Sequence, residues 1–393
     1  MTVAHNHGNH ASHGPWALFR LISGHICLHS AMAGMRMAAP LFALREGYSA
    51  LSVGVLLALF SLAQVFLAIP AGRFADRHGL RRPIGWAVVI ASAGAVVSVA
   101  FPSFEALCFS ALCMGGATGV SAIALQRHVG RAAANALELK RVFSWLSIGP
   151  AISNFLGPVA AGLLIDHAGF RVAFVLGAVL PLLAWFWVHN AQELPPAPQA
   201  KGGVSAQVWS LLRDATMRRL LVVNWLLSSC WDVHTFVVPV LGHERAFSAS
   251  VIGAILGAFA IAAACVRLAL PALAHHLREW VVITGAMVAT AVLFAVYPMM
   301  HSAWTMGMCS VLLGLALGMV QPMMMSTLHQ ITPHALHGQA IALRLMSLNL
   351  SSVLMPMLFG TAGAIVGVSV VFWSVGAIVG LGAHTAWRLR PNP

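Results

Sequence analysis

Polar side chains recur at helical spacing within two stretches that are otherwise apolar. In the first stretch, His25, His29, Met32, Arg36 and Pro40 follow one another at intervals of three or four residues. An α-helix has about 3.6 residues per turn, so these side chains lie along one stripe of a helix. Arg36 on this stripe could bind an anionic or zwitterionic molecule, and imidazole together with thioether suits copper.

The second stretch carries Asn224, Ser228, Asp232 and Thr235 at the same kind of spacing. A charged residue at the centre of a membrane helix costs roughly 2.5–3.5 kcal/mol on insertion scales, so such residues usually face water or a partner. Two interpretations therefore remain open for Arg36 and Asp232. They contact a bound molecule or ion, or they form a static ion pair between two helices.

The composition is that of a membrane protein. Hydrophobic residues make up 59% of the 393 residues, charged residues only 8%, and the mean hydropathy is +0.84. Soluble domains have about 25% charged residues. The net charge of +12 does not indicate a nucleic-acid partner, because the basic residues are spread along the chain between apolar stretches instead of gathering on one surface. We therefore expect a lipid bilayer and no nucleic acid as partner.

Apolar stretches of span length alternate with short polar connections. If the N-terminus is cytoplasmic, most lysines and arginines fall on the cytoplasmic face, while Arg45, Arg171 and Arg245 fall outside. This asymmetry predicts that both termini are cytoplasmic. The predicted spans are 16–44, 49–72, 83–101, 104–126, 142–165, 170–189, 219–242, 248–270, 280–298, 302–327, 340–363 and 367–387.

The longest polar connection divides the chain near its midpoint. It contains P-P-A-P and K-G-G, and on its two sides Y-S-A-L-S-V-G at 48–54 parallels F-S-A-S-V-I-G at 247–253. A linker between two repeated halves is indicated. The predicted organisation is a His-rich cytoplasmic tail (1–15), an N-terminal six-helix half (16–189), a cytoplasmic linker (190–218), a C-terminal six-helix half (219–387) and a cytoplasmic tail (388–393).

A charged segment follows the second apolar stretch directly. Residues 72–83 read G-R-F-A-D-R-H-G-L-R-R-P, and their position behind a span predicts that they lie at a membrane face. The segment resembles the loop between the second and third helices of the major facilitator superfamily of secondary transporters, with the pattern G-x-x-x-D-R-x-G-R-[RK]. Leu80 stands where the family often has Arg. The matching residues, interpreted as a gating loop, are Gly72, Asp76, Arg77, Gly79, Arg81 and Arg82.

The resemblance implies an all-α membrane protein with twelve transmembrane helices in two pseudo-symmetric six-helix halves around a central cavity. We expect Asp76 to pair with Arg127 or Arg131 and to accept hydrogen bonds from the start of the eleventh helix, near 338–344, in the outward-open state. In the family, the first, fourth, seventh and tenth helices line the cavity. The expected cavity residues are His29, Met32, Arg36, Asn224, Ser228, Asp232, Thr235, Trp304 and Gln321.

The fifth predicted span carries S-N-F-L-G-P-V-A-A-G at 153–162. It is similar to the G-P-x-x-G-G signature of the drug:proton antiporter branch of the family. Gly157, Pro158 and Gly162 form this motif, which predicts a helix that can bend and pack closely against a neighbour. The fourth span departs from the branch, because Ala111 and Met114 stand where it usually has Arg and Gln. We therefore assign proton coupling to Asp232, with His29 as a relay.

These observations favour a proton-coupled exporter of a small amphipathic organic molecule, working by alternating access as a monomer in a bacterial cytoplasmic membrane. The alternative is a transporter of a transition metal such as copper, or of a metal chelate, with His25, Cys27, His29 and Met32 as ligands; Arg36 on the same stripe would repel a bare cation. No cofactor is expected. An enzyme is disfavoured, because the sequence has no H-E-x-x-H motif and no paired acids within a span.

Overall fold

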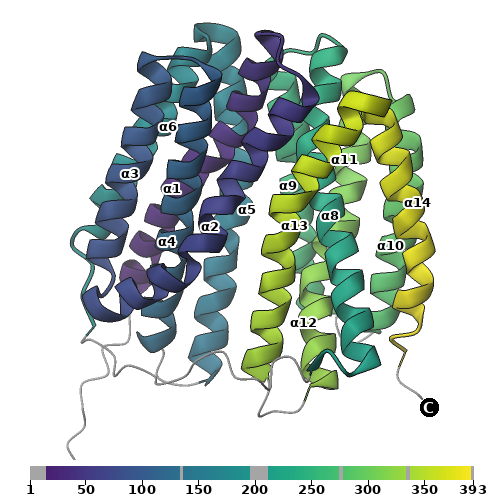
Figure 1. The fold of residues 1–393 in the computed structure, drawn as a ribbon. Coiled ribbons are helices and arrows are strands. Elements are labelled where there is room, and N and C mark those ends of the chain that lie inside the picture. Colours follow the sequence, from purple (N-terminus) through teal and green to yellow (C-terminus); the bar gives the residue numbers. More distant parts are fainter. Residues whose placement is uncertain (1–14, 133–135, 195–210, 274–277, 333–336, 391–393) are drawn as a thin grey trace, which may run out of the picture.

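The computed structural model describes residues 15–132, 136–194, 211–273, 278–332 and 337–390. Over this part of the chain the secondary structure is helical (Figure 1). The N-terminal half contains α1 (Pro15–Arg45), α2 (Ala50–His78), α3 (Arg81–Ala100), α4 (Phe104–Ala132), α5 (Ala136–Ala168) and α6 (Phe170–Val188). The C-terminal half contains α8 (Ala215–Glu244), α9 (Ala249–Leu273), α10 (Glu279–Val296), the 3-10 turn η2 (Tyr297–Met299), α11 (Ala303–Gly318), α12 (Val320–Ile331), α13 (His337–Val366) and α14 (Val368–Trp387).

Twelve segments of the described chain are long and apolar enough to cross a bilayer. Eleven of these spans each contain one α-helix. The remaining span, Ala303–Ile331, contains both α11 and α12 and is broken next to Gly318. The prediction of twelve spans is thereby confirmed, although the break in this span was not predicted. The His-rich tail up to residue 14 and the linker residues 195–210 lie outside the described residues.

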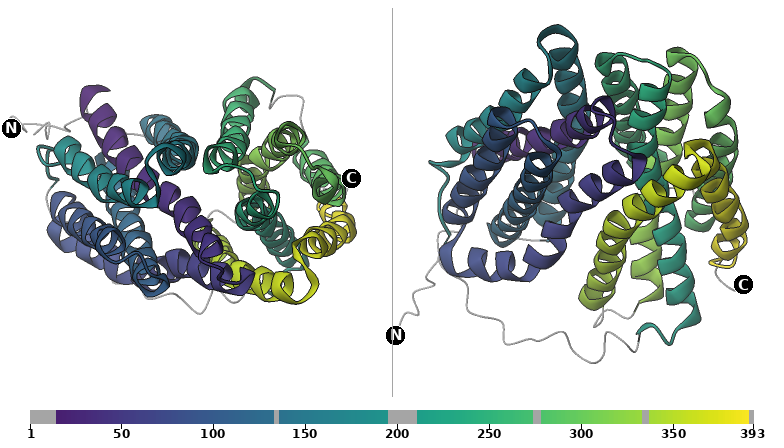
Figure 2. Two further views of the ribbon diagram at one scale, coloured as in Figure 1. Left: turned by 90° about the horizontal axis from the view of Figure 1, so that it is seen from above. Right: turned by 45° about the horizontal axis from the view of Figure 1, so that its top comes forward.

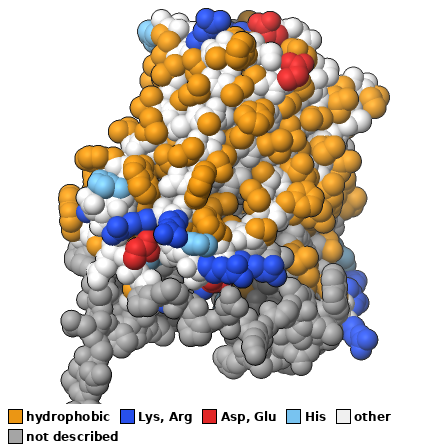
Figure 3. Space-filling view, turned by 60° about the vertical axis from the view of Figure 1, so that its left-hand side comes forward, with side chains coloured by type: hydrophobic (Ala, Val, Ile, Leu, Met, Phe, Trp, Pro, Cys, Tyr) orange, Lys and Arg blue, Asp and Glu red, His pale blue; other side chains and the backbone are white. Residues whose placement is uncertain are grey.

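The outer surface of the bundle is apolar, as lipid contact requires. Large side chains such as Trp86, Phe186 and Leu381 are exposed there. Figure 3 shows one such face, where hydrophobic side chains cover the middle and Lys and Arg side chains gather near the lower end. At that lower end α6 ends and α8 begins (Figure 1). A helix bundle with an apolar exterior is stable only in a bilayer.

The two six-helix halves lie side by side and meet along two pairs of helices (Figure 2). α2 packs on α13, and α5 packs on α9. Small residues permit both contacts: the backbone of Gly54 passes so close to Pro356, and that of Gly162 so close to Ala249, that a methyl group would not fit. Such close approaches are typical of membrane helices, where van der Waals packing drives association. Both contacts lie at the end of the bundle opposite the one where α6 ends and α8 begins.

The segment 72–83 is not the loop that the sequence predicted. α2 continues through the charged residues to His78, and only Gly79 and Leu80 connect it to α3. A helix that leaves the bilayer can continue into water because its backbone groups are already paired. Gly79 ends it with a φ of 73°, in the left-handed region that favours glycine. The gating residues therefore lie on the last turns of one helix and the first turn of the next.

Candidate functional site

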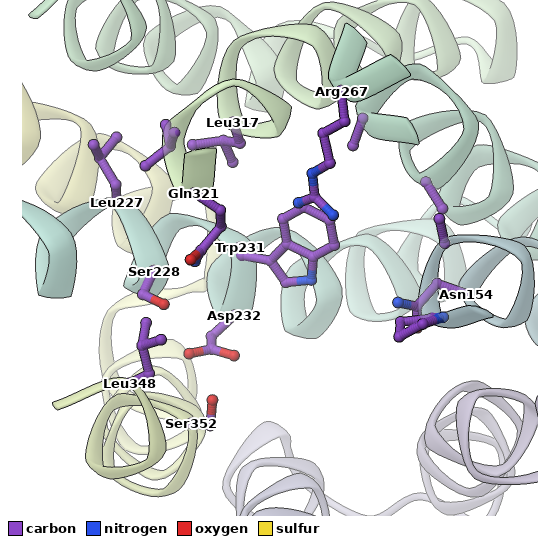
Figure 4. Close-up of a pocket in the computed structure, with 15 residues that line it drawn as sticks. Asn154, Leu227, Ser228, Trp231, Asp232, Arg267, Leu317, Gln321, Leu348 and Ser352 are labelled. Atoms are coloured by element: carbon purple, nitrogen blue, oxygen red, sulfur yellow. The ribbon is translucent and has the colours of Figure 1, made fainter. Parts of the chain in front are cut away.

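A cavity of about 270 Å³ lies between the two halves (Figure 4). α5 contributes the wall from the N-terminal half, and the C-terminal half contributes the rest. We call this cavity the large lobe. It is lined by Pro150, Ala151, Asn154, Leu227, Ser228, Trp231, Asp232, Ala260, Ala263, Arg267, Leu317, Val320, Gln321, Leu348 and Ser352. Mostly apolar walls with a few polar groups are typical of sites for small organic molecules.

A smaller cavity of about 50 Å³, the small lobe, adjoins the large one. Asn154, Trp231 and Ala260 line both lobes, so the two form one site. The small lobe brings in α1 through Arg36, and α8 contributes Thr235. The residues that the sequence placed on two stripes are thus partly brought together. Ser228, Asp232 and Gln321 line the large lobe, while Arg36 and Thr235 line the small one.

Asp232 is the carboxylate of this site. It is buried, and the Ser351 hydroxyl of α13 donates a hydrogen bond to it at 3.2 Å. Its carboxylate and the Ser352 side chain both reach the large lobe (Figure 4). Among the residues that line the two lobes, Asp232 is the only acid. A carboxylate that lines the cavity and accepts a hydrogen bond from a hydroxyl can be neutralised by a proton or a cation that arrives through the cavity.

Arg36 enters the small lobe without a fixed partner. It makes no hydrogen bond and no ion pair within the described part of the chain, and its buried Nε atom is unsatisfied. Ion pairs within 4.0 Å join Arg81 to Glu193 and Arg127 to Asp76, but none joins Arg36 to Asp232 in this conformation. Arg36 and Asp232 still attract each other across the cavity. The static ion pair is therefore not formed here.

Arg267 of α9 is a lining residue that the sequence analysis missed. Its Nε donates a hydrogen bond to the Gly318 carbonyl oxygen at 3.1 Å, and its Cζ lies 5.7 Å from the centre of the Trp231 ring. Gly318 ends α11 at the break in the tenth span, so its carbonyl has no partner in a continuing helix. From the sequence, Arg267 was only one of the basic residues that set the orientation of the protein in the membrane. The break and the aromatic ring together hold the guanidinium over the cavity.

A second cation is buried behind the large lobe. Arg344 of α13 is 4% exposed. Its Nε donates to the Asn224 side-chain oxygen at 3.0 Å, and its Nη2 donates to Gln321. Its third contact is with the Met325 sulfur at 3.2 Å. Asn224, expected to line the cavity, instead supports Arg344. These partners are neutral, so the positive charge of Arg344 is not compensated by a neighbouring acid among the described residues.

Three other expected cavity residues do not line either lobe. His29 is half-buried on α1 with an unsatisfied Nδ1 atom. Met32 is buried, and its sulfur accepts a weak hydrogen bond from Gln64 at 3.6 Å. Trp304 is 86% exposed at the start of α11, on the outside of the bundle. The assignment of Trp304 to the cavity was wrong, because a residue near the end of an apolar helix carries no signal of which side faces lipid.

The structure does not support a metal site. No group of three His, Cys, Asp or Glu side chains could hold a metal ion within the ranges that the structure describes. The His25 and His29 rings are 5.7 Å apart between centroids, and Met32 is turned to Gln64. The four residues of the metal alternative thus do not converge.

The gating residues form a small network below the cavity. The Nη1 atom of Arg127 on α4 forms an ion pair with Asp76 and also donates a hydrogen bond to the Gly72 carbonyl at 3.1 Å. Arg131 lies beside Arg127 and lines the same small pocket. Arg77 and Arg82 are exposed. This network binds α2 to α4 within one half.

Glu193, in the first residues after α6, joins this network, and the sequence analysis missed it. Its two carboxylate oxygens accept hydrogen bonds from the backbone N–H groups of Leu80 and Arg81, at 2.9 and 2.7 Å. These N–H groups begin α3, where an anion is favoured by the helix dipole. The Arg81 Nε also donates to the Ala191 carbonyl at 2.6 Å. The start of the linker is therefore held to the α2–α3 turn.

The motif of Gly157, Pro158 and Gly162 lies at helix contacts. Gly157 packs against the α1 backbone at Ser30 and Gly34, whereas the Pro158 carbonyl faces α9. One turn beyond Gly162, Asp166 accepts hydrogen bonds from the first N–H groups of α9. The hydrogen bonds that join the two halves in the described chain all involve Asp166. This end of the bundle is closed.

The fold and the central cavity between two six-helix halves define the class of protein. The family model described as Major Facilitator Superfamily matches residues 21–332 and 220–393, and the chain belongs to this family. It is a transporter of the multi-pass inner-membrane type and not an enzyme.

Relatives and solved structures agree with this assignment. The multidrug resistance protein MdtG of Salmonella dublin is 25% identical over 87% of this chain and 86% of its own. The class B tetracycline resistance protein of Escherichia coli is 29% identical, but the match covers only 39% of either chain. A POT family transporter in complex with a thioalcohol-conjugated peptide has a TM-score of 0.78 at 12% identity, over 93% of this chain and 94% of its own. Nucleoside transporter NupG has a TM-score of 0.74 at 14% identity, over 95% and 100%. The solved structures establish the fold, and the resistance proteins agree with the resemblance to the drug antiporter branch.

Proposed function

We propose that this transporter is a proton-coupled exporter of a small amphipathic organic molecule, with both termini and the linker in the cytoplasm. The drug-resistance relatives favour export of an organic molecule. The size of the large lobe and its mostly apolar wall suit a small cargo of that kind.

The arrangement of the halves supports alternating access. Their close contacts and the Asp166 hydrogen bonds lie at the end where α8 ends and α9 begins. The cavity lies between those contacts and the opposite end, where α6 ends and α8 begins. With a cytoplasmic linker, the structure is an inward-facing conformation that loads cargo from the cell interior. Rocking of one half against the other around the cavity would then expose the same residues to the outside.

The observation that carries the proton coupling is Asp232, the single acid of the two lobes. A carboxylate at this position can release its proton toward the cytoplasm in the inward-facing state, and cargo that binds nearby changes the balance between its two protonation states. Export then requires a fresh proton from outside. A group that alternates in this way couples the proton gradient to the cargo.

The test uses purified protein in liposomes. A thermal-shift screen of organic anions, zwitterions, cations and metal chelates first selects the molecule that stabilises the folded protein most. The uptake of this molecule is then driven by an imposed pH gradient. We expect Asp232→Asn to abolish uphill uptake while exchange without a gradient continues. Asp214→Asn is the matched control, because Asp214 only caps the start of the same helix and Asn caps it equally well.

Normal uphill uptake by Asp232→Asn would contradict the assignment of Asp232. Uptake by the unmodified protein that is insensitive to the pH gradient would contradict proton coupling altogether.

A further inference from the structure

The charges around the two lobes do not balance. Arg36 and Arg267 line the lobes, Arg344 lies directly behind Gln321, and Asp232 is the single acid. None of the three arginines forms an ion pair with a carboxylate in the described part of the chain. A buried cation without a counter-charge is costly, and the cost is lowest where an anion can arrive.

The three arginines differ in how many of their N–H donors are already used in hydrogen bonds. A guanidinium has five N–H donors. Arg344 uses its donors on Asn224, Gln321 and Met325 and is a fixed background charge. Arg267 uses its Nε on the Gly318 carbonyl, and Arg36 makes no hydrogen bond and no ion pair within 4.0 Å among the described residues. The free donors are therefore those of the two residues that reach the cavity.

An apolar surface lies between these free donors. Trp231 lines both lobes, is covered on one side by the Arg267 guanidinium, and packs edge-on against Phe259 with ring centroids 4.5 Å apart. Asn154 of α5 completes the junction of the lobes from the opposite half. A flat apolar molecule against Trp231 would therefore lie next to Arg267 in the large lobe and Arg36 in the small lobe.

We infer that the cargo of this site is an organic anion, a flat apolar body that rests on Trp231 and carries a carboxylate or similar group bound by Arg36 and Arg267. This inference rests on the proposed function, because it names the cargo of the same cavity. The two arginines come from α1 and α9, which belong to opposite halves. An anion bound by both therefore links the halves and lowers the excess positive charge of the site.

The experiment measures binding at equilibrium by calorimetry, with the purified full chain in lipid nanodiscs. Three probes share one ring system and differ in charge: naphthalene-2-carboxylate, naphthalene-2-carboxamide and 2-naphthylmethylammonium. We expect the carboxylate to bind most tightly. Arg36→Gln and Arg267→Gln should each weaken its binding about tenfold, or ~1.4 kcal/mol, and should leave the carboxamide within about twofold.

Arg390→Gln is the matched control. Arg390 lies 5.7 Å from the centre of the Trp280 ring, the same separation that joins Arg267 to Trp231, but outside the cavity. It should leave the affinity for the carboxylate unchanged. If Arg36→Gln fails to fold, Arg36→Lys keeps the charge and should keep the order of the three probes.

Two results would overturn the inference: failure of the carboxylate to bind, or binding of the ammonium or the carboxamide that equals or exceeds it. No gradient is present in this experiment. Its outcome is thus independent of proton coupling and of the direction of transport, and either proposal can fail alone.

Discussion

The Asp166 carboxylate at the end of α5 accepts a hydrogen bond from the Ser250 backbone N–H, at 2.7 Å, in the first turn of α9. The same carboxylate accepts from the Ala249 N–H at 2.9 Å and from the Ser250 hydroxyl. An acid at a helix N-terminus satisfies N–H groups that have no partner within the helix. Because α5 and α9 belong to different halves, this contact stabilises the closed end of the transporter.

Asp166→Asn should therefore favour opening at this end. The amide keeps the shape but loses the charge and one acceptor, which for this exposed group costs about 1 kcal/mol and shifts the equilibrium about fivefold. Spin labels at positions 46 and 366, on opposite halves at the same end, should report a larger population of long distances. The native cysteines are replaced first to remove the label background, because Cys265 is exposed and Cys27, Cys108 and Cys113 are partly exposed. An unchanged distance distribution would show that the Asp166 contact does not control closure.

The pair of Asp76 and Arg127 should matter for the rate of transport and not for folding. Asp76→Asn keeps the size of the side chain and removes its charge, so insertion and thermal stability should stay near normal while initial transport in liposomes slows. Exchanging the two residues, as Asp76→Arg with Arg127→Asp, should also keep stability near normal but should not bring back the normal rate if the carboxylate contacts α13 in another conformation. Transport at the normal rate in Asp76→Asn would mean that the segment 72–83 only sets the orientation of the protein in the membrane.

Arg36 and Asp232 should act independently and not as a fixed pair. Because they are not within ion-pair distance here, Arg36→Ala with Asp232→Ala should still lack gradient-driven uptake. Arg36→Ala alone should weaken binding of cargo, and Asp232→Asn alone should uncouple it. A static pair makes the opposite forecast, because each single change would then leave a buried charge and lower stability. Recovery of uphill uptake in the double variant would end the proposal for Asp232.

Asn224 should contribute stability through Arg344. Asn224→Ala removes the acceptor of the Arg344 Nε and leaves a buried donor unsatisfied, which costs about 1–3 kcal/mol. The thermal unfolding midpoint of the purified protein should fall. Asn349→Ala is the control, since Asn349 is exposed on the same helix as Arg344. Equal midpoints for the two variants would mean that the Arg344 contact contributes nothing to stability.

The orientation in the membrane can be tested with single cysteines in a variant from which the six native cysteines have been removed. A cysteine at position 201 should be protected from an impermeant maleimide in intact cells and should react after lysis. A cysteine at position 171, on the opposite face, should react in intact cells, because Arg171 is exposed at the start of α6. Labelling of position 201 from outside would reverse the proposed topology and, with it, the inward-facing assignment.

The sequence alone determined the number of spans, the two halves and the family. These features depend on the length and hydropathy of contiguous segments, which need no knowledge of neighbours. The resemblance of the segment at 72–83 also predicted that Asp76 pairs with Arg127 or Arg131, and in the structure Asp76 pairs with Arg127. Even there the sequence predicted a loop where α2 continues to His78, because nothing between Gly72 and His78 tells a helix in water from a turn.

Only the tertiary structure decided which side chains meet at the cavity. Arg267 reaches it because α11 ends at Gly318 and because Trp231 supports the guanidinium, whereas Trp304 points away from it. Lipid and a protein interior are both apolar, so a membrane helix carries little sequence signal of which face is buried. The separation of Arg36 from Asp232, and the contact of Asp166 with α9, likewise depend on how the two halves are placed in one conformation.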